Sequence, residues 1–246
     1  MDLGDATWPE IEETRRGHVL AIPLGSLEQH GPHLPLDTDT RIAVELAGRL
    51  AAARPAVAVG PALAYGASGE HAGFPGTLLV RHEVLAELVV ELVRSARTSF
   101  AAVVVISAHG GNAEGLAMAE ERCRAEGDAV LVWTAVTRGG DAHAGRTETS
   151  LMLAIDERSV RTELAERGCT EPLEAIMPRL RAEGVRPVSS NGVLGNPEGA
   201  SAAEGRTLLD DMAEALSDAV VAWWPPSENG PPENGPPEGG PPEGGR

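Results

Sequence analysis

Aromatic side chains are scarce in this sequence. They make up 3% of its 246 residues, whereas apolar residues as a whole make up 42%. That share is large enough for a real hydrophobic core, but the core must consist mainly of alanine, valine and leucine. The length allows one large α/β domain or two small ones.

Long apolar runs and paired cysteines are also missing. No stretch has the roughly 20 consecutive apolar residues that cross a bilayer, and the opening MDLGDATWPE lacks the basic start and apolar stretch of a signal peptide. The two cysteines, Cys123 and Cys169, make no disulfide framework, and neither has a second cysteine at metal-ligand spacing. We therefore expect a cytoplasmic protein with no membrane partner.

Positive charge is limited as well. Lysine and arginine together number 20 against 37 aspartates and glutamates, which gives a formal net charge of −17. A nucleic-acid interface needs clustered basic residues that displace counterions from phosphates, so we expect no nucleic-acid partner. The charge does not identify a partner, because net charge bears mainly on solubility and steering.

Short β-branched runs alternate with helical patterns along most of the chain. The predicted strands are 18–25, 56–61, 101–107 and 129–136, and the predicted helices are 40–53, 81–97, 112–127, 147–155 and 201–224, with Asn112 as a helix cap. This alternation predicts an α/β fold with three layers, in which helices cover both faces of a mostly parallel central sheet. Ligands of such sheets bind at the carboxyl ends of the strands, so the loops that follow the strands should meet at one crevice.

The last segment differs in composition from the rest. PPSENGPPENGPPEGGPPEGGR (225–246) is a near-repeat without leucine, isoleucine, valine or aromatic residues. Such a segment cannot bury enough apolar surface to offset its chain entropy. We therefore predict a single domain over 1–224, followed by a disordered tail of the polyproline type over 225–246. A docking role for the tail stays open.

The loops after three predicted strands hold most of the unusual polar residues. EQHGPHLPLDTD follows the first strand, HGGN follows the central strand, and GGDAHAGRTETS follows the next one. Mixed shells of histidine and carboxylate suit zinc, iron or manganese. Two such ions about 3.5–4 Å apart can generate hydroxide at neutral pH and hold the group that it attacks. Without cations, this many acids in one crevice would repel one another, so the pattern favours a metal site.

Each motif alone has a plainer interpretation. The E-x-H pattern can be a solvated turn, and HGGN can be a glycine loop whose amides bind phosphate at a helix N-terminus. The phosphate interpretation is weak, because the P-loop lysine and the full G-x-G-x-x-G pattern are both missing. A non-catalytic phosphate-binding module is therefore a remote alternative. We interpret His18 as structural and His82 as a surface residue.

Taken together, GSLEQHGPHLPLDTD, YGASGEHAGFPGT, SAHGGN and HAGRTETS resemble the creatininase-like amidohydrolase family over about residues 8–224. Members of that family use two divalent metal ions and form homo-oligomers. The resemblance implies that Glu28 and His30 bind different metals and that Asp39 is the carboxylate that bridges them. Its neighbour Asp37 has the wrong offset, so we interpret it as a turn residue. The metals are zinc, iron or both, with manganese as a further option.

The resemblance also implies roles in the other two loops. His109 matches the family's ligand histidine after the central strand. Creatininase proper carries an acid two residues later, where this chain has Gly111, and this departure argues against creatinine as the substrate. Glu148 is then the best remaining acidic ligand. His143 matches a family histidine used in proton transfer, and it could protonate a leaving amine.

Four further residues are candidates for contact with the substrate. His33 either binds substrate or orients a ligand. Ser68 and His71 lie in the glycine-rich segment and can form a substrate lid. Arg146 belongs to the HAGRTETS motif and could pair with a substrate carboxylate.

A narrower resemblance concerns one branch of the family. PLDTDTRIA, AYGASGEHAGFPGT, GGDAHAGRTETS and GVLGNPEGASAAEG are similar to the peptidase branch that acts in mycofactocin maturation. This implies hydrolysis of a peptide C–N bond by a metal-bridging hydroxide, with release of a modified Val-Tyr-derived dipeptide from the C-terminus of a small precursor peptide. The alternative within the enzyme class is a small-molecule amidohydrolase that acts on a cyclic amide or a formamide.

Overall fold

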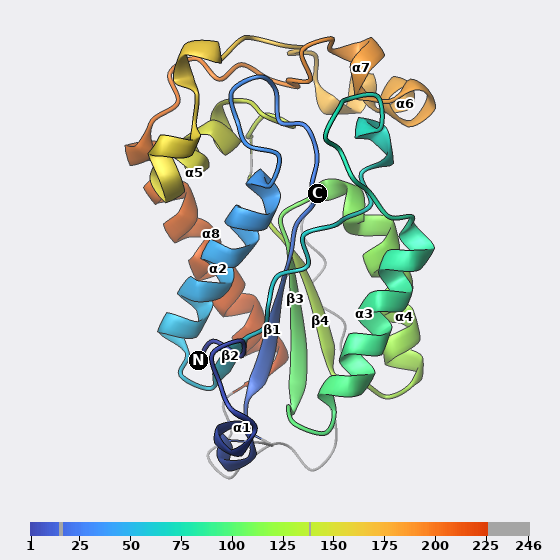
Figure 1. Ribbon diagram of the computed structural model, residues 1–246, viewed down its shortest axis with the longest axis vertical. Coiled ribbons are helices and arrows are strands. Elements are labelled where there is room, and N and C mark those ends of the chain that lie inside the picture. The colour runs from blue at the N-terminus through green and yellow to red at the C-terminus, as the bar shows by residue number, and fades with distance from the viewer. Residues whose placement is uncertain (15–16, 138, 226–246) are drawn as a thin grey trace.

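The central feature of the fold is a parallel β-sheet between two layers of helices. A computed structural model describes residues 1–14, 17–137 and 139–225 (Figure 1). In these residues the sheet has four strands in the order β2-β1-β3-β4. The strands are β1 (Val19–Leu24), β2 (Val57–Val59), β3 (Ala102–Ser107) and β4 (Val130–Thr134). The helices are α1 (Trp8–Thr14), α2 (Thr38–Ala53), α3 (His82–Ala96), α4 (Ala113–Ala125), α5 (Arg146–Asp156), α6 (Leu173–Glu183), α7 (Val185–Val188) and α8 (Ala202–Trp223).

The two central strands consist mainly of apolar residues. Every residue of β1 and of β3 is buried, as expected for parallel strands that are covered on both faces. They pair in register from Val19 opposite Ala102 to Leu24 opposite Ser107. This pairing places the ends of β1 and β3 side by side, so the loops that follow them start from neighbouring points.

The helices divide between the two faces of the sheet. In Figure 1, α2, α5 and α8 lie on one side and α3 and α4 on the other. Val104 and Ile106 of β3 pack in a cluster with Leu46 of α2. Val103 and Val105 point to the opposite face, where they join the cluster that contains α3 and α4. Because successive side chains of β3 point to opposite faces, the strand contributes to two cores, one on each side of the sheet. This confirms the predicted three-layer α/β architecture.

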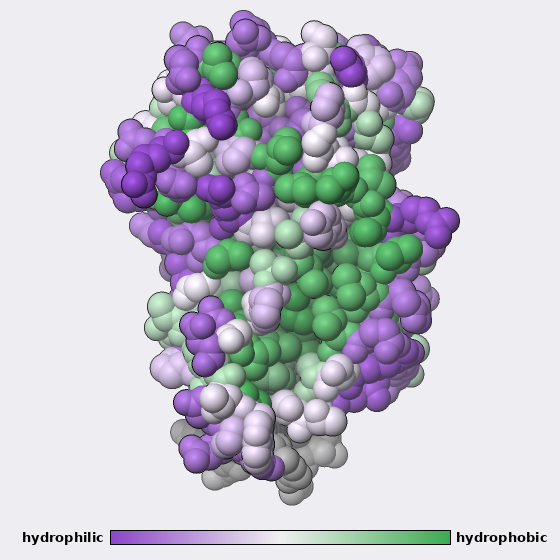
Figure 2. All heavy atoms as spheres, in the orientation of Figure 1, coloured by the Kyte–Doolittle hydropathy of each residue, from purple (hydrophilic) through white to green (hydrophobic). Residues whose placement is uncertain are grey.

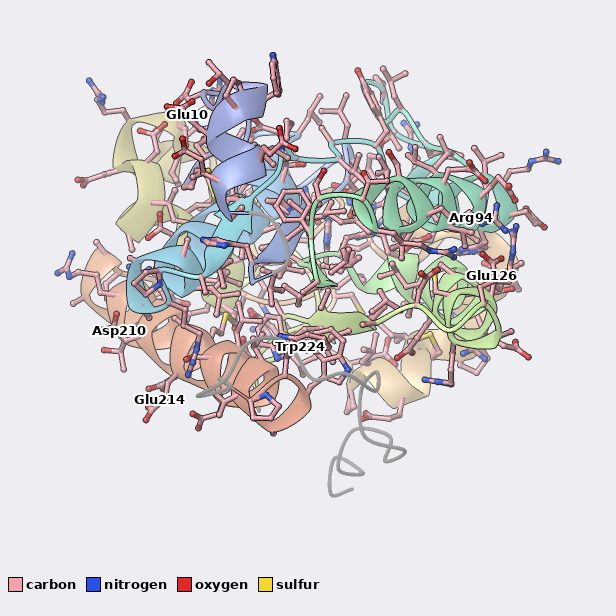
Figure 3. The ribbon with its side chains drawn as sticks, turned by 90° about the horizontal axis from the view of Figure 1, so that it is seen from below. Glu10, Arg94, Glu126, Asp210, Glu214 and Trp224 are labelled. Atoms are coloured by element: carbon pink, nitrogen blue, oxygen red, sulfur yellow. The ribbon has the colours of Figure 1, made fainter. Side chains whose placement is uncertain are left out.

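Exposed ion pairs join the two helices of one outer layer. Arg94 of α3 donates to Glu126 at the end of α4 over 2.7 Å, and the two side chains point toward each other in Figure 3. Arg97 pairs in the same region with Asp128. Exposed pairs of this kind add little stability, so the layer depends mainly on its buried leucines and valines.

The predicted strands and helices are confirmed to within about two residues, but other elements were missed. No pattern in the sequence predicted α1, nor the helices α6 and α7 in the stretch between α5 and α8. Helix α6 contains Pro178 and buries only Ile176 and Leu180, so its apolar periodicity is weak.

The predicted tail lies, from residue 226 on, outside the described residues. None of the described helices is long and apolar enough to cross a membrane.

Candidate metal centre

A cavity of about 890 Å³ opens at the carboxyl ends of the strands. Its wall includes Asp39, His71, His109, His143 and Glu148. His109 and His143 lie in the loops after β3 and β4, and the segment before α3 supplies His71. Asp39 and Glu148 lie in the first turns of α2 and α5, the helices that follow β1 and β4. Helices α6 and α7 cover the same end of the sheet (Figure 1). The crevice expected from the strand order is therefore present and rich in possible ligands.

Glu28 carries the least compensated charge among the buried acids beside the cavity. Its side chain is fully buried, and neither carboxylate oxygen accepts a hydrogen bond. His71 Nε2 lies 3.2 Å from Oε1 and His109 Nε2 lies 3.2 Å from Oε2. Burial raises the pKa of Glu28 to about 7. A buried carboxylate without hydrogen bonds is costly unless a cation neutralises it, so Glu28 fits a metal ligand.

Asp39 lies between two imidazoles in the first turn of α2. Its Oδ1 is 3.2 Å from His30 Nε2, and its Oδ2 is 3.3 Å from His109 Nδ1. Ser26 Oγ also donates to Oδ2, over 2.6 Å. Burial opposes ionisation, but the two imidazoles hold the pKa of Asp39 well below its usual value. One carboxylate with its two oxygens directed at different histidines has the arrangement expected of a bridging ligand.

A second group of ligand atoms lies on the other side of Asp39. Glu148 Oε2 is 3.9 Å from both His30 Nε2 and His143 Nδ1. The other ring nitrogen of His30, Nδ1, lies 3.1 Å from the main-chain oxygen of Glu28. A carbonyl oxygen can only accept, so Nδ1 carries a proton and Nε2 is the nitrogen that can bind a metal.

The donor atoms fall into compact sets. Glu28, Asp39 and His109 form one set, and His30, His143 and Glu148 form a second, each with all atoms within 4.8 Å of one another. A third set of Glu28, His71 and His143 overlaps both. Mixed nitrogen and oxygen donors at this spacing suit divalent transition metals. The residues present therefore fit a metal centre.

Protonated imidazoles balance the carboxylates when no cation is bound. Burial disfavours the charged form of His30, but Asp39, Glu148 and Glu28 outweigh it and raise its pKa to about 10. Burial likewise opposes charging of His109, and Glu28 and Asp39 raise its pKa to about 10. Two imidazolium protons thus occupy positions where metal ions would otherwise supply positive charge.

This charge balance predicts that metal affinity rises with pH. Burial raises the pKa of Glu28 to about 7, so about nine-tenths of this carboxyl is protonated at pH 6 and about one-tenth at pH 8. A metal binds the deprotonated form, and it must also displace protons from His30 and His109. We expect affinity at least about tenfold weaker at pH 6 than at pH 8, as measured by competition with a chelating dye. An affinity that is flat over this range would contradict the assignment.

Two supporting contacts fix the start of α5, where Glu148 lies. Asp141 accepts hydrogen bonds from the main-chain nitrogens of Arg146 and Thr147. His33 is fully buried, and its Nε2 lies 2.8 Å from Thr149 Oγ1. His33 is therefore in contact with the helix that carries Glu148 and is not among the residues that line the cavity.

The other candidates for substrate contact differ in position. His71 lines the cavity, and Ser68 Oγ lies 3.4 Å from His109 Nε2. Arg146 is half-exposed, and its Nε donates to Glu204 of α8 over 2.9 Å. It is not in the wall of the cavity. The structure thus brings Ser68 and His71 to the cluster of candidate ligands and directs the guanidinium of Arg146 toward α8.

Asn112 has a different role from the predicted one. Its side chain makes no capping bond at α4. It accepts from the main-chain nitrogen of Ala67 over 2.8 Å and donates to the carbonyl of Gly25 over 3.1 Å. A fully buried amide thus ties the loop after β1 to the glycine-rich segment, which the local cap pattern could not reveal.

Gly111 has no room for a side chain. A Cβ atom there would lie 2.3 Å from His109 Nε2 and 2.5 Å from Glu70 Oε1. The Glu70 carboxylate, 3.7 Å from His109 Nε2, thus occupies the space next to Gly111. Sequence reasoning missed Glu70, although it stands directly before the candidate His71. The acid that creatininase proper carries at this position would not fit here.

Replacing Gly111 with alanine is expected to displace His109 and weaken metal binding. Overpacking of this kind typically costs about 1–3 kcal/mol of folding free energy. Gly110→Ala is the matched control, because a Cβ on Gly110 meets no atom within 4 Å. Metal content and thermal unfolding of the two purified variants would measure the difference. Equal metal content in both would show that Gly111 is not a steric requirement of the site.

Comparisons with known proteins agree with this geometry. The family model described as Creatininase: Creatinine amidohydrolase matches residues 4–220. The mycofactocin precursor peptide peptidase of Mycolicibacterium smegmatis (strain ATCC 700084 / mc(2)155) is 47% identical over 214 residues, which cover 84% of this chain and 86% of the relative. The creatinine amidohydrolase of Pseudomonas putida is 27% identical, with coverage of 92% and 98%.

Solved structures show the same fold. A crystal structure of creatinine amidohydrolase superposes with a TM-score of 0.72 at 26% identity and covers 90% of this chain and 96% of its own. A structure named Creatininase Mn gives a TM-score of 0.73 at 26% identity, with coverage of 90% and 97%. Another neighbour is a mutant creatininase of Zn-Zn type, so such relatives carry zinc or manganese. On this evidence of sequence and fold, the chain belongs to the creatininase family.

Proposed function

We propose that this chain is a metal-dependent hydrolase that cleaves a peptide C–N bond and releases a modified Val-Tyr-derived dipeptide from the C-terminus of a small precursor peptide. The observation that carries the hydrolase proposal is the fully buried carboxylate of Glu28, without a hydrogen bond, between two histidines. Relatives named mycofactocin precursor peptide peptidase, 43–47% identical, support the peptide substrate.

The proposed cofactor is a pair of divalent ions, zinc, iron or manganese. Glu28, Asp39 and His109 would hold one ion, and His30, Asp39 and Glu148 would hold the other, with Asp39 shared. When bound, the ions would supply an ionised water as nucleophile and polarise the scissile carbonyl. The protein would hold both donor sets in a buried pocket, where charge interactions are stronger than in water.

His143 is the proposed proton carrier. Its Nδ1 faces the cluster, 3.7 Å from Glu28 Oε1 and 3.9 Å from Glu148 Oε2. Burial lowers the pKa of the ring well below the usual value, and Nε2 holds the remaining proton against the carbonyl of Gln29, so Nδ1 is unprotonated at neutral pH. It can accept the proton of the attacking water and then give it to the departing amine. Both transfers need only one nitrogen, because the amine leaves from the carbon that the water attacks.

The cavity has the size and lining for the end of a peptide. Its volume of about 890 Å³ lies at the upper end of the range for small-ligand sites. Leu173, Met177 and Leu180 of α6 form an apolar part of its wall. Apolar side chains of the released dipeptide could pack there, while the polar floor holds the scissile bond. Arg146, which pairs with Glu204, would first have to leave that partner to reach a substrate carboxylate.

The test is incubation of the full chain with the modified precursor peptide, with and without a chelator, followed by mass spectrometry. We expect loss of the C-terminal dipeptide mass only when metal is present. A panel of cyclic amides and formamides, creatinine included, tests the alternative that the relative from Pseudomonas putida raises. Cleavage of an amide but not of the peptide would replace the proposed substrate. Cleavage that is insensitive to chelator, in a metal-free protein, would overturn the mechanism.

A phosphate-binding module remains the non-enzymatic alternative. It predicts that Glu28→Gln changes neither metal content nor activity, whereas the proposed hydrolase loses both. Glutamine has the same shape as glutamate but no charge, so packing around this fully buried position is preserved. Metal analysis of the folded variant therefore distinguishes the two.

Self-association and a separate tail are further parts of the proposal. Exposed apolar side chains include Leu78 and Leu79 before α3 and Val84 and Leu88 within it. Figure 2 shows apolar side chains gathered over the middle of one face of the molecule. Such a patch suits a homo-oligomer, which light scattering would detect. Deletion of the residues after Trp224 would test whether 1–224 is a complete catalytic domain.

A further inference from the structure

Gln29 lies between two of the proposed metal ligands and is the only glutamine in the sequence. Its side chain is 5% exposed and has a partner at each end. The main-chain nitrogen of Gly31 donates to Oε1 over 2.9 Å, and Nε2 donates to the carbonyl of Gly192 over 3.0 Å. A backbone N–H only donates and a backbone carbonyl only accepts, so these two groups fix which end of the amide is which.

The oriented amide determines where His71 carries its proton. Gln29 Nε2 lies 2.9 Å from His71 Nδ1. An amide nitrogen can only donate, so Nδ1 must accept and the proton of the neutral ring must be on Nε2. That nitrogen faces the cluster, 3.2 Å from Glu28 Oε1. Glu28 Oε1 makes no hydrogen bond, so the N–H of His71 stays available to another acceptor in the cavity.

The main chain of the same residue determines the proton position in His143. The Nε2 of His143 lies 2.8 Å from the carbonyl oxygen of Gln29. The carbonyl can only accept, so Nε2 holds the proton and Nδ1 presents a lone pair toward Glu28 and Glu148. Gln29 Nε2 is also 3.0 Å from His143 Nε2. Both hydrogens of the amide already have acceptors, in Gly192 and His71, so this contact needs no further bond.

The contacts of each ring show which nitrogen is free of a proton. His71 Nδ1 accepts from the Gln29 amide, so it carries no proton. His143 Nδ1 lies 3.7 Å from Glu28 Oε1 and 3.9 Å from Glu148 Oε2, so it donates a hydrogen bond to neither carboxylate. The loop that contains Gly192 approaches the Gln29 amide closely. Gly192 has a φ of 82°, and a Cβ there would lie 1.8 Å from Gln29 Oε1. Only glycine at 192 lets this loop approach the amide so closely.

We propose that Gln29 is a positioning residue that holds His71 and His143 in complementary tautomers, so that one presents an N–H and the other a lone pair to the same carboxylate. The N–H of His71 can then stabilise negative charge that develops on a substrate carbonyl oxygen. The lone pair of His143 is ready to accept a proton. The catalytic use of the tautomers rests on the proposed hydrolysis. The assignment of the tautomers rests only on the hydrogen-bond contacts of Gln29.

The tautomers can be read directly by long-range ¹H–¹⁵N NMR of the zinc-loaded full chain. We expect His71 to show a protonated Nε2 and an unprotonated Nδ1, with signals identified by their loss in His71→Ala. Labelling with ¹⁵N-glutamine gives a single side-chain amide pair, since the sequence has one glutamine. Its hydrogens should exchange slowly with solvent. A His71 proton on Nδ1 in the unaltered protein would overturn the proposal without any variant.

Two substitutions with side chains of similar size distinguish a positioning role of Gln29 from a role in packing alone. Gln29→Glu keeps the shape but can only accept, so the proton of His71 should move to Nδ1. Gln29→Met keeps the length without a donor, so His71 should show both tautomers. The tautomer of His143 should stay unchanged in both, because a main-chain carbonyl sets it. An unchanged His71 in a folded, zinc-loaded Gln29→Glu protein would refute the role of Gln29.

The kinetic constants of the two Gln29 variants test whether the tautomers are used in catalysis. With metal content retained, we expect both variants to lower kcat by at least about tenfold and to change KM by less than about threefold, because the lost interaction acts in the transition state. If the NMR result holds but no peptide or amide is hydrolysed by the unaltered chain, the proposed function fails and the tautomer assignment stands. If the unaltered chain is active and the variants keep full kcat, the proposed catalytic use of the tautomers fails.

Discussion

Replacing Asp39 with asparagine is expected to remove both metal ions and to lower activity by at least about a hundredfold. Asp39 lies within about hydrogen-bond distance of a histidine in each ligand set, through Oδ1 toward His30 and Oδ2 toward His109. An asparagine has one oxygen and one amide nitrogen, so it can serve only one of the two positions as a ligand. Loss of a primary ligand should exceed the 10–100-fold effect that is typical of residues behind the ligands.

Asp37→Asn is the matched control for this prediction. Asp37 is two residues away at the cap of the same helix and is partly exposed. Its Oδ1 accepts from Arg41 Nε over 2.8 Å, and it faces no imidazole of the cluster. We expect metal content and activity close to those of the unaltered chain. Inductively coupled plasma analysis and peptide cleavage would be compared on the two proteins. Two ions retained in Asp39→Asn would show that the bridge is elsewhere.

The comparison also tests how the sequence distinguishes two neighbouring acids. Both belong to the run LDTD, and both lie where the loop after β1 becomes α2. The resemblance to the family singled out Asp39 by its offset from Glu28. The structure gives a physical reason, since Asp39 is buried and Asp37 forms an exposed pair with Arg41. Asp37 and Asp39 are two positions apart, and two steps along a helix turn a side chain by about 200°, so the two acids reach different environments.

The position of the site could be predicted because it depends on strand order. Apolar runs at β1, β3 and β4 predict a parallel sheet, and a parallel sheet brings the loops that follow its strands to one edge. Glu28 and His109 lie in the loops after β1 and β3, and Glu148 lies in the first turn of the helix that follows β4. The structure brings all three to one cavity or its buried floor. The positions of the strands along the chain were therefore enough to predict that the candidate ligands lie together. Their roles as ligands stay proposals.

The direction of individual side chains could not be predicted in the same way. Arg146 is part of a motif near the cluster, but Glu204, 58 residues later, pairs with its guanidinium. Glu70 fills the space beside Gly111, and only the folded chain shows that contact. Gln29 is oriented by Gly192, 163 residues away. In each case a distant partner decides where the side chain points, and no local pattern encodes that partner.

Removing the imidazole of His143 is expected to lower kcat far more than it lowers metal content. Two of the compact donor sets include His143, so it can act as a ligand or as the proton carrier. The one set without it keeps three strong donors in Glu28, Asp39 and His109, and Asp39 also contacts His30. We therefore expect His143→Ala to retain most of its metal and to lose about a hundredfold to ten-thousandfold in kcat, as for loss of a general acid–base group.

Added imidazole should restore part of the activity of His143→Ala, because the substitution leaves a space at the cavity wall that a free ring can enter. His18→Ala is the control, since His18 precedes β1 at the opposite end of the sheet from the cavity. Its activity should be unchanged and insensitive to imidazole. If His143→Ala instead loses one metal ion, and added metal rather than imidazole restores activity, then His143 is a ligand. The proton would in that case have to move through another group, and the N–H of His71 is the nearest alternative on the same carboxylate.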